Sequence, residues 1–148
     1  MTDDERGLMM LEKSIYMAQE ILEKKQTFHP FAMLLDTEGK IETVQSSIEN
    51  SRDAYMALSE EVRGYVEEKP IDIIVLLSDV SLPENIGEEG IESGIRVHLE
   101  ERSQLHKKIA GRYIYIPYQL QRLAGEEVIH AKLFTPVAVS FPSEFLKV

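Results

Sequence analysis

Apolar residues recur at alternating spacings of three and four near the start of the chain, which is the period of an amphipathic helix. Thr2 followed by Glu5 has the form of a capping box and places the start of this helix. Lys24 and Lys25 lie where the helix dipole favours cations. The pattern predicts a helix of about six turns that covers a core with one face. The stripe consists of Leu8, Leu11, Ile15, Ala18 and Leu22, and it is broadened by Met10, Met17 and Ile21.

Two short apolar runs follow, separated by the residues of a tight turn. The first run is 31–35, the turn 36–39 begins with Asp and ends with Gly, and partial alternation resumes over 40–44. Asp at the first position and Gly at the last are typical of a β-turn. These three segments predict a β-hairpin.

A second helical stripe lies between a cap and a proline. Asn50 or Ser51 can cap this helix, and Pro70 stops it. The following segment, 71–77, is almost wholly apolar, with Asp72 its only polar residue. We therefore expect 71–77 to be a strand at the centre of the sheet, covered on both faces. The stripe of the helix consists of Tyr55, Leu58, Val62 and Tyr65.

The segment 80–92 is rich in residues that disfavour regular structure. It contains Pro83, Gly87 and Gly90. Such a composition buries little apolar area, so we expect a long, acidic, mobile loop. Its carboxylates lack the alternating oxygen ligands of an EF-hand, which favours a solvated run of charge over a calcium or magnesium site. The acidic residues are Glu84, Glu88, Glu89 and Glu92.

Strict alternation begins after this loop. Over 95–100 and again over 112–118, every second residue is apolar, which predicts strands with one buried and one solvent-exposed face. A reversal near Ser103 would join them into a long hairpin. The segments 128–134 and 137–141 predict one or two further strands, separated by Pro136.

Helices kept apart from consecutive antiparallel strands indicate the α+β class. We expect one domain over 1–148, with a mainly antiparallel sheet of five to six strands and two helices in the order α-β-β-α-β-β-β-β. In this element order the chain resembles the profilin-like architecture of profilins and of roadblock and longin modules. The resemblance implies a fold, and because no family motif matches, it implies no functional residue.

Composition narrows the possible functions. The chain has 148 residues, of which 43% are hydrophobic, enough for one core. It has no cysteine, which excludes disulfides, thiolate zinc sites and thiol nucleophiles. A net charge of −10 disfavours nucleic acid and anionic lipid surfaces as partners. The acidic N-terminus and the lack of a long apolar stretch lead us to expect no membrane association and a cytoplasmic location.

Established catalytic and metal-binding motifs are not found. The chain has no Gly-rich phosphate loop, so we expect no nucleotide and no other cofactor. It has no Gly-x-Ser-x-Gly nucleophile, so a hydrolase triad has no support either. His98 and Glu100 would project from one strand face, and His130 could complete a two-histidine, one-carboxylate metal site. The favoured interpretation is that such polar residues cover the exposed face of a sheet, with no metal bound. The remaining histidines, His29 and His106, show no ligand spacing.

A group of tyrosines marks the best candidate for a recognition surface. Tyr113, Tyr115 and Tyr118 present large amphipathic rings of the kind enriched at binding sites. If the two alternating strands pair, Arg96 and His98 share the face of Tyr113 and Tyr115. Two interpretations remain open: the rings form a binding surface, or they pack under the acidic loop or against a helix.

A complete fold pattern without a catalytic motif predicts a non-catalytic protein-binding or self-associating module, with a protein or a second copy of the chain as partner. One variant of this hypothesis is that the acidic chain neutralises a basic protein. The alternative is a small-molecule sensor or enzyme with a pocket between the sheet face and the loop 80–92, lined by Arg96, His98, Glu100 and Tyr115.

Overall fold

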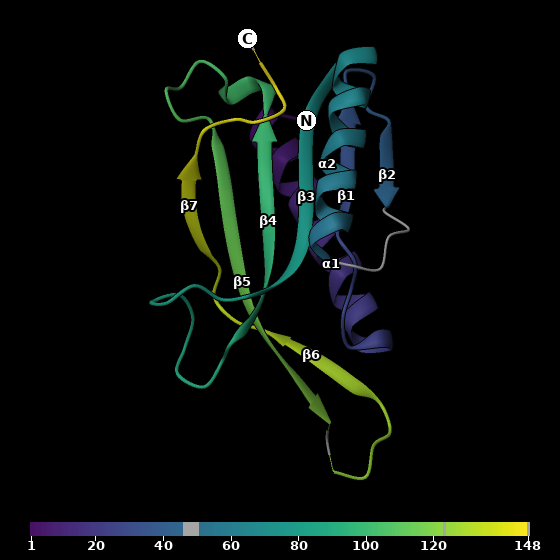
Figure 1. Ribbon diagram of the computed structural model, residues 1–148, viewed down its shortest axis with the longest axis vertical. Helices are drawn as coiled ribbons and strands as arrows, with labels where there is room; N and C mark the ends of the chain where they lie inside the picture. The colour runs from purple at the N-terminus through teal and green to yellow at the C-terminus, as the bar shows by residue number, and fades with distance from the viewer. Residues whose placement is uncertain (46–50, 123, 148) are drawn as a thin grey trace.

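The computed structural model describes residues 1–45, 51–122 and 124–147, without the side chain of Ser51. One sheet of seven strands stands between two helices, α1 (Asp3–Lys25) and α2 (Ser51–Glu68), which lie on opposite faces of it (Figure 1). The α+β class and the antiparallel sheet are thus confirmed. No helix among the described residues is long and apolar enough to cross a membrane.

All strand pairs are antiparallel, and the order across the sheet is β2-β1-β3-β4-β5-β6, with β7 also paired to β5. A short 3-10 helix, Arg102–Gln104, lies between β4 and β5. The strands are β1 (Phe31–Asp36), β2 (Ile41–Gln45), β3 (Ile71–Ser81), β4 (Ser93–Glu101), β5 (Gly111–Arg122), β6 (Ile129–Leu133) and β7 (Val137–Phe141).

Local sequence signals placed most elements correctly. The Thr2 side chain accepts a hydrogen bond from the backbone N–H of Glu5 at 3.2 Å, as a capping box requires. The hairpin β1–β2, the long hairpin β4–β5 and the central position of β3 are as predicted. The predicted cap of α2 falls on Asn50 and the side chain of Ser51, which lie outside the described residues.

The last two predicted strands are separate elements that share one partner. β7 pairs with the first half of β5, over Gly111 to Tyr115, and β6 pairs with the second half, over Tyr118 to Arg122. Pro136 lies between them, where its missing N–H removes no ladder hydrogen bond. This division brings the sheet to seven strands.

Two hydrophobic cores lie on the two faces of the sheet, and β3 contributes to both. Ile73, Val75 and Leu77 pack on the α1 side, whereas Ile74 and Leu76 pack on the α2 side. Burial on both faces explains why this segment is apolar without alternation. The α2-side core also contains Ala32, Leu34, Val44, Leu58, Val62, Ile71, Phe145 and Leu146.

One expectation for β4 is wrong. Its alternation predicted a solvent-exposed face at Arg96, His98 and Glu100, but His98 and Glu100 are both 0% exposed. The segment 143–147, which we call the C-terminal strap, covers this end of the face, with Phe145 at 4% and Leu146 at 1% exposure. Alternation shows which residues share a face of the sheet. It does not show whether that face is exposed, because a segment from elsewhere in the chain can cover it.

The acidic loop, 82–92, covers the other end of the same face. A Cβ at Gly94 would collide with the side chain of Leu82, and a Cβ at Gly87 would lie 3.5 Å from Pro117. The loop therefore packs on β4 and β5 through its first and middle residues.

Candidate binding surface

The α2 face of the sheet is only partly covered by α2 itself. This helix packs on β1, β2 and β3, and Figure 1 shows β4, β5 and β7 beside it with no helix in front. The strap and the acidic loop cover the two ends of that area, as described above. The region between them we call the open face. Its side chains come from three strands: Arg96, Tyr113, Tyr115, Val137, Val139 and Phe141.

The register of the strands brings these side chains together. Arg96 lies opposite Tyr115 on the paired strands, and Val139 lies opposite Tyr113. Residues directly opposite each other in an antiparallel pair point to the same face. Val137, Val139 and Phe141 remain 37–38% exposed, so the open face ends in an apolar margin at β7.

Arg96 lies between two tyrosine rings. Its guanidinium carbon is 5.3 Å from the ring centre of Tyr55 on α2 and 4.9 Å from that of Tyr113. Such contacts hold the cation over the negative faces of the rings. Arg96 forms no ion pair with any described residue, so its charge is available to a partner.

Both tyrosines stay neutral under physiological conditions. Burial raises the pKa of Tyr113 to about 12, helped by the neighbouring Tyr55 and Glu144 and opposed by Arg96. Burial likewise raises the pKa of Tyr55, although Arg96 acts in the opposite direction. Neither phenol therefore compensates the arginine charge.

Tyr113 also joins β5 to the edge of the sheet. Its ring centre is 4.3 Å from that of Phe141, and its hydroxyl donates to Glu144 Oε1 at 3.4 Å. On the other side the ring of His98 meets it edge-on at 4.9 Å. Tyr113 is thus held by packing, whereas Tyr115 is half-buried and has no ring contact among the described residues.

His98 and Glu100 form a buried pair beneath the strap. His98 Nε2 lies 2.5 Å from Glu100 Oε2, and the carboxylate accepts the backbone N–H groups of Glu144 at 2.8 Å, Phe145 at 3.1 Å and Leu146 at 2.9 Å. Burial favours the neutral acid, but the hydrogen bonds from His98 and from the backbone of Leu146 and Glu144 outweigh it and hold the pKa of Glu100 below its ordinary value. The ionised carboxylate fixes the strap.

The predicted site residues therefore divide into three groups. Arg96, Tyr113 and Tyr115 lie on the open face, in the register that the predicted patch requires. His98 and Glu100 share that face but are buried. His130 lies elsewhere, on β6, 3.1 Å from Glu126. The described residues contain no group of three His, Cys, Asp or Glu side chains that could hold a metal ion.

Tyr118 was grouped with the wrong side of β5. It points to the α1 core with Ile114 and Ile116, where it is 6% exposed and its hydroxyl donates to Asp79 Oδ1 at 2.6 Å. In a regular strand, even-numbered and odd-numbered residues point to opposite faces of the sheet. Alternation alone therefore predicts that Tyr118 points away from the face of Tyr113 and Tyr115.

The sequence pattern assigned no candidate role to the residues of β7, which border the open face. Their signal is the stretch 133–143, the longest in the chain without Asp, Glu, Lys or Arg. In a chain with 28% charged residues, such a stretch at an exposed margin is unusual.

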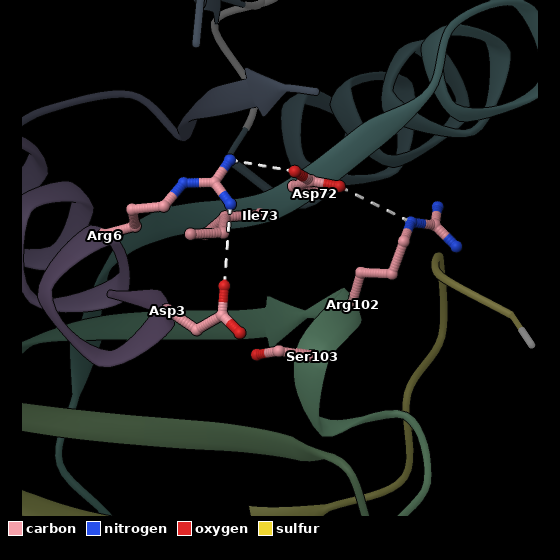
Figure 2. Close-up of a pocket in the computed structure, with 6 residues that line it drawn as sticks. All are labelled: Asp3, Arg6, Asp72, Ile73, Arg102 and Ser103. Carbon is pink, nitrogen blue, oxygen red and sulfur yellow. Dashed lines mark hydrogen bonds and ion pairs between the residues drawn. The ribbon is translucent and has the colours of Figure 1, made fainter. Parts of the chain in front are cut away.

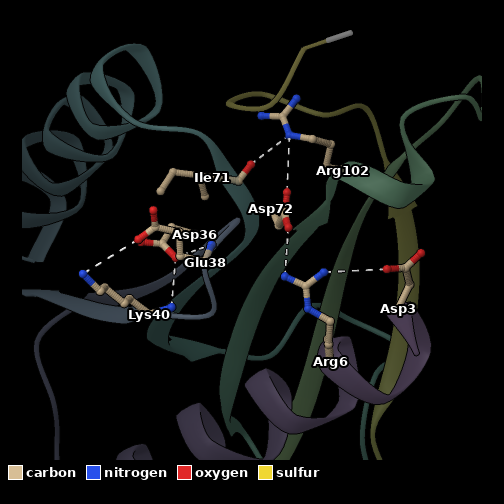
Figure 3. Close-up of polar contacts among 8 residues, drawn as sticks. All are labelled: Asp3, Arg6, Asp36, Glu38, Lys40, Ile71, Asp72 and Arg102. Carbon is tan, nitrogen blue, oxygen red and sulfur yellow. Dashed lines mark hydrogen bonds and ion pairs between the residues drawn. The ribbon is translucent and has the colours of Figure 1, made fainter. Parts of the chain in front are cut away.

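A polar cavity of about 220 Å³ lies between the start of α1, β3 and the 3-10 helix (Figure 2). Arg6 bridges Asp72 at 2.8 Å and Asp3 at 3.7 Å, and Arg102 lies 3.9 Å from Asp72 and donates to the carbonyl of Ile71. Figure 3 shows these contacts beside the β1–β2 turn. Each charge here has a partner within the chain, which indicates that these ion pairs join α1, β3 and the 3-10 helix and stabilise the fold.

The acidic loop lines a separate, open pocket of about 470 Å³. Its lining comes only from the loop and the end of β3, residues 81–92. None of Arg96, His98, Glu100 and Tyr115 lines it. The residues expected to form a shared pocket with this loop are therefore not gathered around this cavity. No family model, curated protein or solved structure matches the chain.

Proposed function

We propose that the chain is a non-catalytic protein-binding module that takes up an extended polypeptide strand beside β7. The observation that carries this proposal is that β7 is an exposed sheet edge without the protection found at the other two edges. An unpaired strand edge presents a row of N–H and C=O groups that a further strand can bind.

The edge at β6 is occupied from within the chain. The N–H of Ala131 donates to Glu23 Oε2 at 3.0 Å, and its carbonyl accepts from Gln19 Nε2 at 2.9 Å. Both side chains come from α1. β6 also carries the charged Lys132, which discourages pairing with another strand.

The edge at β2 is protected by charge. Its residue Glu42 pairs with Lys69 at 3.3 Å, and Lys40 precedes the strand. A charged residue on an edge strand opposes the approach of a second strand.

The edge at β7 has neither form of protection. No described side chain or loop is hydrogen-bonded to its backbone, whose strand pairing is with β5 alone. It bears no charge, and Val137, Val139 and Phe141 are exposed beside Arg96 and the tyrosines of the open face. Aromatic and arginine side chains are the residues that most often dominate binding energy at interfaces. A bound strand would hydrogen-bond to β7 and place alternate side chains on this face.

No comparable observation supports the alternative function as a sensor or enzyme. His98 and Glu100, its proposed proton carriers, are fully buried; Glu100 is hydrogen-bonded to the strap, and His98 to Glu100. A basic partner has no special support either, because the exposed edge is uncharged.

A peptide selection tests the proposal. Random linear peptides are selected on the immobilised protein, and the affinity of a selected peptide is measured by fluorescence polarisation with the wild type, Val139→Lys and Val128→Lys. Val128 is exposed but lies outside β7, so it controls for the added charge. We expect Val139→Lys to weaken binding at least about tenfold and Val128→Lys to leave it unchanged.

The main-chain contribution is tested with the same peptide. Two N-methylated forms of the peptide are made, one at the odd-numbered and one at the even-numbered amides, so that each form lacks the hydrogen-bond donors of one strand edge. The form that lacks the donors facing β7 should not bind. Selected peptides that bind Val139→Lys as well as the wild type, or that tolerate both N-methylated forms, would contradict strand addition at β7.

A further inference from the structure

We infer that the strand bound beside β7 is β7 of a second copy of this chain, so that two chains form a twofold dimer with one continuous sheet. This inference rests on the proposed function, because it requires that the β7 edge accepts a strand. Closed twofold dimers are the commonest homo-oligomers, and their interface must be complementary to itself.

The pattern of β7 meets this requirement of self-complementarity. Antiparallel pairing centred on Val139 places this residue opposite its own copy and Val137 opposite Phe141 of the other chain. Residues at odd positions then meet only residues at odd positions, so the apolar side chains of both copies gather on one face. Ala138 and Ser140, which are small, occupy the other face.

The open faces of the two copies become continuous in this arrangement. One row across the interface would run from Tyr113 through Val139 to the same two residues of the second copy. The next row would run from Tyr115 through Val137 to Phe141 of the second copy, which itself lies opposite Gly111 on β5. A Cβ at Gly111 would lie only 2.8 Å from the carbonyl oxygen of Phe141, so the absence of a side chain there lets this end of β7 lie close to β5.

Charge supports a second copy as the occupant of this edge. Two chains of net charge −10 repel each other, and like charges directly opposite in a strand pair destabilise the pair. Since residues 133–143 include no charged side chain, two copies can approach at β7 without bringing like charges opposite each other. The edges at β2 and β6 offer no such approach, because both strands carry charge.

Sedimentation equilibrium tests the dimer with the full chain. The wild type is measured from micromolar to near-millimolar concentration at physiological salt, together with Val139→Lys and Val128→Lys, whose folding is checked by circular dichroism. The wild type should reach a mass twice the 16.9 kDa of the chain. Val139→Lys should raise the dimer dissociation constant at least about tenfold, because two lysines then meet at the twofold axis. Val128→Lys should leave it unchanged.

Single cysteines test the register. The chain has no cysteine, so any disulfide between copies reports on the introduced residue. The Cα atoms of directly opposite residues in an antiparallel strand pair lie about 4.5–5.5 Å apart, a distance that a disulfide can span. Val139→Cys should cross-link to itself under mild oxidation. Val137→Cys should cross-link efficiently only when mixed with Phe141→Cys, and Val128→Cys should stay monomeric.

The outcomes separate this inference from the proposed function. A wild type that stays monomeric throughout, while a selected peptide still binds at β7, would overturn the dimer and retain the binding module. A dimer that is insensitive to Val139→Lys, or that cross-links equally through Val128→Cys, would place the interface elsewhere and overturn the inference. A monomer for which no peptide binds at β7 would overturn both.

Discussion

The position of the strap on the sheet should depend on the carboxylate of Glu100, and replacing this residue gives the sharpest test of the fold. Glu100 is the only described side chain that accepts hydrogen bonds from the strap backbone N–H groups of Glu144, Phe145 and Leu146. Two of these donors belong to residues that are less than 5% exposed. In Glu100→Ala they would be left buried without an acceptor.

The size of the effect follows from general values. A hydrogen bond to a charged group contributes about 1.5–3 kcal/mol, and a buried donor left unpaired costs about 1–3 kcal/mol. We expect Glu100→Ala to lower the free energy of unfolding by about 3–5 kcal/mol, because it leaves the buried N–H groups of Phe145 and Leu146 without an acceptor and removes their hydrogen bonds to a charged group. Glu100→Gln should cost less, because its amide oxygen still accepts.

Urea denaturation measures the loss, and hydrogen exchange locates it. The amides of Glu144, Phe145 and Leu146 should be protected in the wild type and exchange faster in Glu100→Ala. Glu89→Gln, a change at an exposed carboxylate of the acidic loop, should stay within about 0.5 kcal/mol of the wild type. A loss below about 1 kcal/mol in Glu100→Ala, with the three amides still protected, would refute the role of this carboxylate.

The same carboxylate predicts a dependence on pH. The pKa of Glu100 is lowered from its ordinary value of 4.5, so the folded state favours the ionised form. Its contribution to stability is therefore fully present above pH 4.5 and is lost as the pH falls through the lower pKa of the folded state. The difference in stability between wild type and Glu100→Gln should be constant near neutral pH and shrink in acid. A difference that grows on acidification would contradict the direction of this shift.

Three further predictions concern the sheet and its edge. Ile114→Ala should lower the free energy of unfolding by about 2–4 kcal/mol in urea, because Ile114 is in the α1-side core, whereas Tyr115→Ala should cost less; the reverse order would mean a shifted register. Arg96→Leu should cost about 1–2 kcal/mol in the same assay, since it removes two ring contacts of about 0.5–1 kcal/mol each; an unchanged stability would show that the ring contacts contribute nothing. Dimerisation measured by sedimentation should strengthen as salt rises, because salt screens the repulsion between two chains of net charge −10; weakening with salt would indicate attraction between charges instead.

Sequence patterns were sufficient for the fold class and for the order of the elements along the chain, because each element carries its own local signal, whereas the order of the strands across the sheet was left open. Thr2 marks a helix start, the 36–39 turn fixes a hairpin, and the apolar run in β3 marks the centre of the sheet. The shared face of Arg96 and Tyr115 followed from alternation in two strands that a short reversal joins.

The remaining features depend on contacts between distant parts of the chain. The hydrogen bond from Glu144 to Glu100 spans 44 positions, and no periodicity within β4 encodes it. The exposed edge was left open for a related reason, because Pro136 is compatible with either an edge or a bend. Strand signals identify 137–141 as a strand, but its place at the edge depends on how β6 and β7 divide β5 between them.

The burial of the strap has a consequence for synthesis on the ribosome. Phe145 and Leu146 fill the core formed by residues of β1, α2 and β3, which are made much earlier. That core therefore cannot close until residue 146 has left the exit tunnel, and until then the nascent chain exposes the apolar residues that the strap covers. Residues 143–146 are therefore required for the fold, since a chain truncated after Pro142 would lack Phe145 and Leu146 of the α2-side core.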